Sequence, residues 1–177
     1  MARMICSCGY LLSTTCVPND IQLRVFTDGE WKSILDDGIK ESWLIPLPTY
    51  DVWKCPDCKS VYVFEWGYGK PVMTYRLEKQ CDHKEWIVSR GTVRENDVMA
   101  HRICSCGHVL STHNEPNNIQ LRVYTDEEWE NILDCEFIDP LMIPLPKYEV
   151  LRCLECKNIY VFERDQDKPV MSYRLEK

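Results

Sequence analysis

Apolar and polar residues alternate over residues 21–26, which is typical of a strand with one buried face. A similar pattern over residues 61–65 and 72–77, interrupted by a short Trp-Gly-Tyr-Gly segment, predicts a hairpin. Residues 50–54 predict another strand. The Ile-Pro-Leu-Pro segment at 45–48 cannot continue a helix and predicts an extended, covered connector, although such a segment can also dock on a partner.

One helix is predicted after the first of these strands. Thr27 and Glu30 have the spacing of a capping box, and Trp31 opens a set of apolar positions at i, i+3 and i+4. The helix is therefore expected to run to about Asp36. We interpret Trp31 and its counterpart Trp129 as core anchors rather than as platforms for a ligand.

The whole pattern occurs twice. Residues 1–79 align with residues 99–177 at a constant offset of 98, without a gap, and 46 of the 79 pairs are identical. We call these segments repeat 1 and repeat 2. The similarity predicts two domains of one fold, joined by a polar linker over residues 80–98, and gene duplication with in-frame fusion explains it. A linker with its own role, docked through residues 86–88, is the alternative.

Pairing the repeats sorts the 11 cysteines. Eight of them form two equivalent sets, each with the pattern C-x-C-G followed by C-x-x-C, and these sets are Cys6, Cys8, Cys55 and Cys58, and Cys104, Cys106, Cys153 and Cys156. Four thiolates can surround one tetrahedral zinc ion, and the glycine after each first pair suits a turn that needs a positive φ. Cys16, Cys81 and Cys135 have no cysteine counterpart, and their roles are open.

Other uses of these cysteines fit less well. A redox C-x-x-C pair leaves the distant C-x-C unexplained, and a rubredoxin-like iron site usually has C-x-x-C on both sides. A catalytic zinc normally keeps an open position and includes histidine or carboxylate ligands. A repeat of 79 residues also buries only a modest core, and domains of this size often need a stabilising metal ion or cross-link. We therefore expect two structural zinc ions, with iron in the cell left open.

Charge and composition limit the function classes. The net charge of −7 disfavours nucleic-acid binding, which needs clustered Lys and Arg. No apolar run is long enough to span a membrane, and the N-terminal segment has no signal-peptide pattern, so a cytoplasmic protein is expected. The repeats share no histidine, no cysteine outside the two sets, and no phosphate-loop or nucleophile-elbow motif. We therefore expect no enzyme activity.

With these elements, the expected fold is α+β: two tandem copies of a small zinc-ribbon-like antiparallel sheet with one inserted helix. The C-x-C-G motif, the C-P-x-C motif before a Tyr/Val-rich strand and the acidic helix between them resemble small uncharacterised bacterial zinc-ribbon proteins. Some such proteins look like immunity or inhibitor partners of toxins, so the resemblance implies such a role. Lys59 and Lys157 depart from the pattern, because a ribbon often has glycine there.

The two repeats differ in charge and therefore in their expected partner surfaces. Repeat 2 has nine basic and 14 acidic residues, whereas repeat 1 has nine and 10. We predict a non-enzymatic protein-interaction module that binds a basic protein through Glu127, Glu128 and Glu130, with Trp66 and Tyr68 as a separate apolar contact. The alternative is a nucleic-acid-binding or transcription-associated zinc ribbon. The oligomeric state is not predicted.

Overall fold

The computed structural model describes residues 2–38, 40–67, 69–80, 102–112, 117–164, 166 and 168–176. Almost all of the expected linker, and Tyr68, lie outside these ranges. No helix within them is long and apolar enough to cross a membrane.

The two repeats contain the same elements in the same order. Those of repeat 1 are β1 (Arg3–Ile5), β2 (Leu11–Ser13), β3 (Gln22–Thr27), α1 (Asp28–Asp36), β4 (Lys40–Glu41), the 3-10 helix η1 (Ser42–Leu44), β5 (Tyr50–Lys54), β6 (Val61–Glu65) and β7 (Met73–Gln80). Those of repeat 2 are β8 (Arg102–Ile103), β9 (Val109–Leu110), β10 (Gln120–Thr125), α2 (Asp126–Leu133), β11 (Phe137–Ile138), the 3-10 helix η2 (Pro140–Met142), β12 (Tyr148–Arg152), β13 (Ile159–Glu163) and β14 (Pro169–Leu175). The strands, the hairpin and the helix predicted from the sequence pattern are confirmed.

The start of each helix is fixed by local chemistry. The Thr27 hydroxyl accepts a hydrogen bond from the Glu30 backbone N–H, and the Glu30 carboxylate accepts one from the Thr27 N–H at 2.7 Å. Thr125 and Glu128 form the same capping box in repeat 2. Each box satisfies donors that a helix N-terminus leaves unpaired, so the predicted helix starts are confirmed.

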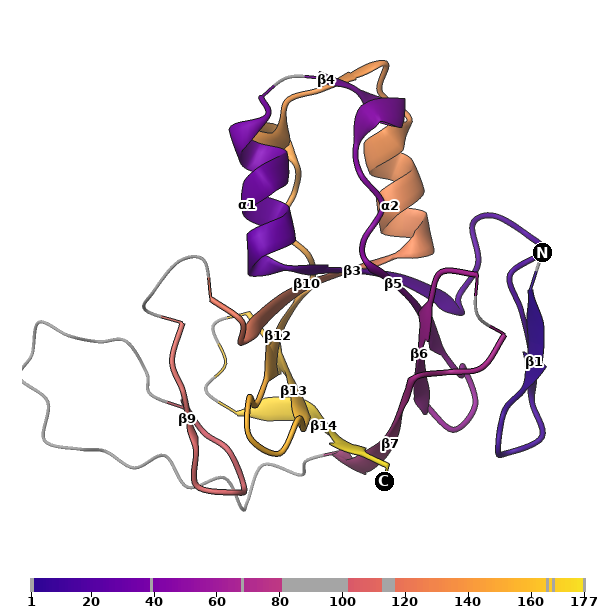
Figure 1. Cartoon of the computed structure of the whole chain (residues 1–177), viewed down its shortest axis with the longest axis vertical. Helices are drawn as coiled ribbons and strands as arrows, with labels where there is room; N and C mark the ends of the chain where they lie inside the picture. Colours follow the sequence, from indigo (N-terminus) through magenta and orange to yellow (C-terminus); the bar gives the residue numbers. More distant parts are fainter. Residues whose placement is uncertain are drawn as a thin grey trace, which may run out of the picture.

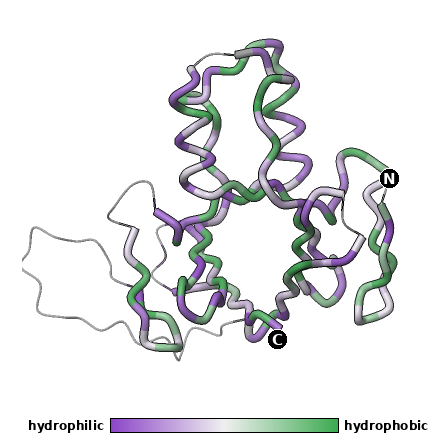
Figure 2. The backbone as a smooth tube through the Cα atoms, viewed as in Figure 1, coloured by the Kyte–Doolittle hydropathy of each residue, from purple (hydrophilic) through white to green (hydrophobic). Residues whose placement is uncertain are grey.

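Eight strands form one closed antiparallel barrel, in the order β10-β12-β13-β14-β7-β6-β5-β3. Each repeat supplies four consecutive members of this ring, which is seen end-on in Figure 1. Hydropathy alternates along the strands of the ring in Figure 2, as expected where one face of each strand points inward. The helices α1 and α2 stand outside the ring beside β3 and β10, and the β1 and β9 hairpins lie on opposite sides of it (Figure 1).

The repeats are related by an approximate two-fold axis. Where β3 meets β10, Val25 pairs with Val123, and where β7 meets β14, Arg76 pairs with Arg174. In both pairs the residue numbers differ by 98, so each strand pairs with its own equivalent. The axis therefore passes through both seams between the repeats, as in a symmetric dimer fused into one chain.

The expected fold of two separate zinc-ribbon-like α+β sheets is wrong. The four barrel strands of one repeat leave two open edges, β3 and β7, whose backbone groups need partners. The equivalent strands of the other repeat provide them, and the two half-barrels close into one mostly β structure. The helix of each repeat is also not packed on its own sheet alone, because α1 contacts β10 and α2 contacts β3.

A helical core on the outside of the barrel joins the two repeats. Trp31 stacks on Tyr124 with a ring separation of 5.7 Å, and Phe26 contacts Trp129 at 4.9 Å, so aromatic residues of each repeat contact those of the other. Trp31 and Trp129 are buried in this cluster, which confirms their prediction as core anchors. Aromatic pairs of this kind add to the free energy gained from burial.

Buried polar contacts hold the same seam. The Asp126 carboxylate accepts hydrogen bonds from the Asn19 side-chain amide at 2.8 Å and from Arg24 Nη2 at 2.9 Å. On the equivalent side the Asp28 carboxylate accepts from the Asn117 N–H at 2.9 Å. Both aspartates begin a helix of one repeat and bind a loop of the other, so the helix positions and the seam are coupled.

Candidate metal centres

The first cysteine pair of each repeat lies on a tight turn between two short strands. In repeat 1 the turn joins β1 to β2; the Cys6 N–H donates to the Tyr10 carbonyl and the Gly9 N–H donates to the Cys6 carbonyl, both at 2.8 Å. Gly9 has a φ of +92°, and its counterpart Gly107 has +88°. A residue with a Cβ would be strained there, so the glycine predicted to allow this turn is confirmed in that role.

The second pair lies on the turn between β5 and β6. The Cys55 N–H donates to the Ser60 carbonyl at 2.8 Å, and the Lys59 N–H donates to the Cys55 carbonyl at 3.1 Å. Lys59 and its counterpart Lys157 have φ values of +62° and +63°. The left-handed conformation that a ribbon usually gives to glycine is thus kept here by lysine, at some cost in backbone strain.

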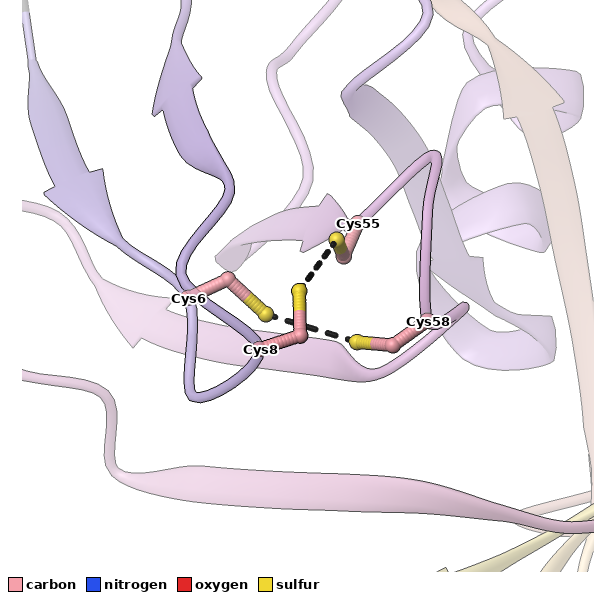
Figure 3. Close-up of side chains that lie close together, drawn as sticks. All are labelled: Cys6, Cys8, Cys55 and Cys58. Atoms are coloured by element: carbon pink, nitrogen blue, oxygen red, sulfur yellow. Dashed lines mark hydrogen bonds between the residues drawn. The ribbon is translucent and has the colours of Figure 1, made fainter.

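These turns bring the four sulfur atoms of each repeat together (Figure 3). In repeat 1, Cys6 Sγ lies 3.4 Å from Cys58 Sγ, and Cys8 Sγ lies 3.7 Å from Cys55 Sγ. The corresponding distances in repeat 2 are 3.4 Å and 3.6 Å, between Cys104 and Cys156 and between Cys106 and Cys153. Zinc with four sulfur ligands at about 2.3 Å requires sulfur–sulfur distances of about 3.8 Å. Each predicted set therefore has a geometry that can hold one metal ion.

A tyrosine that the sequence analysis missed supports each group. The Tyr62 hydroxyl accepts a hydrogen bond from the Ser7 N–H and lies 3.1 Å from Cys6 Sγ, so its proton can point to the sulfur. Tyr160 has the same relation to Ser105 and to Cys104 Sγ, also at 3.1 Å. Such outer contacts orient metal ligands and stabilise their charge. The available signal was that this tyrosine occurs in both repeats.

The sulfur atoms of each group differ in how readily they lose a proton. Burial raises the pKa of Cys6, but hydrogen bonds from the Tyr62 hydroxyl and the Cys8 backbone outweigh it and lower the pKa to about 6. Burial also opposes ionisation of Cys104, but hydrogen bonds from the Cys106 backbone and Tyr160 lower its pKa to about 7. These sulfurs therefore provide the first thiolate of each group near neutral pH.

The ligand sets are complete with cysteine alone. Over the part of the chain that the structure describes, no histidine or carboxylate belongs to either group. Cys16 and Cys135 are exposed and stand apart from both groups, and Cys81 lies outside the described residues.

The residues predicted to bind a partner differ in exposure and in the contacts that they already make. Glu127 is exposed, Glu128 is held by the capping box with Thr125, and Glu130 is partly buried. Trp66 is half-exposed, and its indole N–H donates to the Pro48 carbonyl at 2.8 Å. Trp66, which was predicted to contact a partner, therefore already makes a hydrogen bond within repeat 1.

Exposed apolar side chains also occur in equivalent segments of the two repeats, and we call this set the apolar tip. It comprises Trp43, Leu44, Leu47, Phe137, Leu141, Met142 and Leu145, which are 50–79% exposed. These seven make up half of the 14 exposed large apolar side chains among the described residues. They come from η1, η2, β11 and the segments after the 3-10 helices. A groove of about 440 Å³ between α2 and the segment after η2 is lined by three of them, Phe137, Met142 and Leu145.

The connector prediction at 45–48 was therefore half right. Ile45 and Pro48 are buried, but Leu47 is exposed. Both repeats have apolar residues at three equivalent pairs of positions, 43 and 141, 44 and 142, and 47 and 145, although the residue type differs in the first two pairs. This shared apolar character was the available signal for the exposed surface.

Comparison with known families supports the repeat structure. The model of a family described as a domain of unknown function (DUF8617) matches residues 2–79 and again residues 100–177. The chain therefore belongs to this family and contains its domain twice, which confirms the tandem repeat. The match does not confirm the resemblance to zinc-ribbon proteins. No curated protein and no solved structure matches the chain at a significant level.

Proposed function

We propose that this tandem DUF8617 protein is a non-catalytic, zinc-stabilised protein that binds a basic protein partner. The observation that carries the proposal is the closed set of four cysteine sulfurs in each repeat, which leaves no ligand position for a substrate. Zinc suits four thiolate ligands and tetrahedral geometry better than the hard cations do. Each centre would tie a peripheral hairpin to the barrel through the β5–β6 or β12–β13 turn.

The metal content can be tested directly. Elemental analysis of the purified full chain should find two zinc ions per chain. Cys58→Ser and Cys156→Ser should each leave one ion, because the two sites are separate, whereas Cys16→Ser should leave two. A folded wild-type chain with one metal ion or none would overturn the metal assignment, and two iron ions would replace zinc by iron.

The apolar tip supports the protein-binding part of the proposal. Its seven large apolar side chains are at least half exposed, and large exposed apolar surfaces mark interaction sites. Several acidic residues adjoin it in repeat 2, including Asp134, Glu136 and Asp139, close in sequence to Glu127 and Glu130 of the predicted surface. A partner with apolar side chains surrounded by basic ones would complement this surface. An inhibitor or immunity-type role against a basic enzyme fits that chemistry.

The alternative is nucleic-acid binding. A surface that combines exposed apolar groups with acidic side chains repels phosphate, so this alternative is less well supported. Tight retention of the wild-type chain on duplex DNA, lost as salt increases, would favour it over a protein partner.

The partner surface can be tested with matched variants. Full-length protein should capture a basic partner from an extract of its host, and the capture should weaken as salt increases. Leu141→Ser with Met142→Ser should abolish capture, whereas Val72→Ser, at a half-exposed apolar position outside the tip, should not. Equal capture by both variants, with two metal ions retained, would exclude the apolar tip as the partner surface.

A further inference from the structure

The interior of the barrel is hollow. A cavity of about 200 Å³ lies inside the ring and is lined by the inward-facing side chains of both repeats. Leu23, Val25, Val61 and Met73 line it, yet each is only partly buried although the sheet is closed around it. Small eight-stranded barrels are either filled by their own side chains or hold one small ligand. Because these side chains stay partly exposed, this barrel resembles those that hold one small ligand.

The cavity volume limits the size of the ligand. A cavity of about 150 Å³ lined by aliphatic and aromatic side chains in another protein binds benzene, so this one suits a molecule of roughly eight to 12 non-hydrogen atoms. The lining is mostly Val, Leu, Ile, Met and Tyr, which favours an apolar body.

Within the part of the chain that the structure describes, two tyrosine hydroxyls of the cavity have a thioether sulfur as their acceptor. Tyr75 OH donates to Met73 Sδ at 3.7 Å, and Tyr173 OH donates to Met171 Sδ at 3.6 Å. A thioether is a poor acceptor, so an oxygen acceptor on a ligand would improve either bond. Both tyrosines are buried, which makes a better acceptor more valuable there.

A cationic side chain lines the same cavity. The Arg152 Nε is buried with no hydrogen-bond partner among the described residues, while its Nη2 donates to the Asn118 carbonyl at 3.5 Å. Burial raises the pKa of Tyr75, and the positive charge of Arg152 partly opposes this. Lys54 occupies the equivalent position in repeat 1 and lines the same cavity. An arginine and a tyrosine hydroxyl that line one apolar cavity provide donors suited to a carboxylate.

The acidic groups of the lining are already engaged. Glu30 accepts hydrogen bonds from the Thr27 N–H and hydroxyl and from the Thr49 N–H, at 2.6–2.8 Å. Glu128 accepts from the Thr125 N–H and hydroxyl. These carboxylates have structural donors at the helix starts, whereas no described residue accepts a hydrogen bond from the Arg152 Nε.

We propose that the barrel interior binds a small apolar molecule that carries one carboxylate, such as a medium-chain fatty acid or an arylalkanoic acid. The apolar body fills the cavity, and the carboxylate accepts hydrogen bonds from Tyr75 OH and Arg152. This site is separate from both metal centres and from the apolar tip, so it does not depend on the proposed function.

Methyl NMR of the full chain can test this site, because methionines report from different places. Octanoate should shift the labelled methyl signals of Met73 and Met171 inside the barrel. It should leave Met142, beside the groove at the apolar tip, unchanged. Octanol, the uncharged control, should bind more weakly. Unshifted signals of Met73 and Met171 at saturating octanoate, or shifts confined to Met142, would overturn the proposal.

Variants separate the two parts of the recognition. Arg152→Gln should weaken octanoate binding roughly tenfold and change octanol binding less than about twofold, because it removes one charge-assisted hydrogen bond. Tyr75→Phe should likewise weaken octanoate binding more than octanol binding. Val25→Phe should fill the cavity and abolish binding of both probes, whereas Val72→Phe on the exposed surface should not. Equal losses for octanoate and octanol in Arg152→Gln would exclude carboxylate recognition.

Discussion

The Asp126 carboxylate is the most sensitive point of the seam between the repeats. It is fully buried at the start of α2, and all of its described hydrogen bonds come from repeat 1. Asn19 donates its N–H at 3.1 Å and its side-chain amide at 2.8 Å, and Arg24 donates at 2.9 Å. Removing the carboxylate therefore breaks a bridge between two segments more than 100 residues apart in the chain.

The size of the effect follows from what is left behind. In Asp126→Ala the Arg24 side chain, which is only 12% exposed in the unmodified protein, loses its counter-charge, and the Asn19 donors lose their acceptor. Breaking a buried ion pair by removing one partner costs about 3–5 kcal/mol. Because small proteins are stable by only about 5–15 kcal/mol, Asp126→Ala should remove a large share of the free energy of unfolding. Asp126→Asn should cost less, about 1.5–3 kcal/mol, because one oxygen remains for Asn19.

Urea unfolding of the metal-loaded chain, followed by tryptophan fluorescence, measures these losses, because Trp31 and Trp129 lie in the core beside the seam. The matched control is Asp36→Ala on α1, where an exposed carboxylate lies 3.6 Å from Lys32. Such surface pairs contribute about 0–1 kcal/mol. A double-mutant cycle with Arg24→Ala should give a coupling energy of about 1–3 kcal/mol. A loss below about 1 kcal/mol for Asp126→Ala, or one equal to that of Asp36→Ala, would refute the role of this contact.

Three further results are expected. A chain of residues 1–80 alone should form a two-fold dimer that rebuilds the barrel, which sedimentation equilibrium would detect. A folded monomer would show that repeat 1 does not need the strand pairing between the repeats. Tyr62→Phe should lower metal affinity in repeat 1 roughly tenfold in chelator competition and leave repeat 2 unchanged. Burial opposes ionisation of Glu30, but hydrogen bonds from Thr27 and Thr49 outweigh it and lower its pKa. Its stabilising effect should therefore be complete above about pH 4.3 and fade as pH falls through the lower, folded-state pKa. Glu30→Gln should abolish that pH dependence in NMR-monitored unfolding.

The local elements were predictable because their causes are local. The capping box of Thr27 and Glu30 needs only four consecutive residues, and strand alternation needs about five. The metal groups were predictable for a different reason. Two cysteine pairs on separate turns complete a four-thiolate metal site only if the turns come together in the fold. The same set of four also occurs twice at one constant offset. The supporting tyrosines were missed because nothing in their local sequence separates them from core residues.

The apolar tip and the cavity were missed because burial is a property of the assembled structure. Leu47 and Ile45 read alike in the sequence, yet one is exposed and the other buried. Val25 and Val52 read alike in the sequence and both line the cavity, yet Val52 is buried and Val25 is only partly buried. The spacing of residues along one strand cannot tell a filled barrel from a hollow one.

The sequence by itself therefore determined the repeats, the four barrel strands and the helix within each, the helix starts and the two sets of metal ligands. The tertiary structure alone decided that both repeats share one barrel. An edge strand such as β3 carries the same alternation whether water, a second protein or its own copy pairs with it, because alternation encodes which face is buried and not which edge is paired. Contacts between residues far apart in the sequence decide which strand pairs with this edge. They include the pairing of Val25 with Val123 in the sheet and the hydrogen bonds of Asp126 with Asn19 and Arg24. Those contacts exist only once both repeats are folded together.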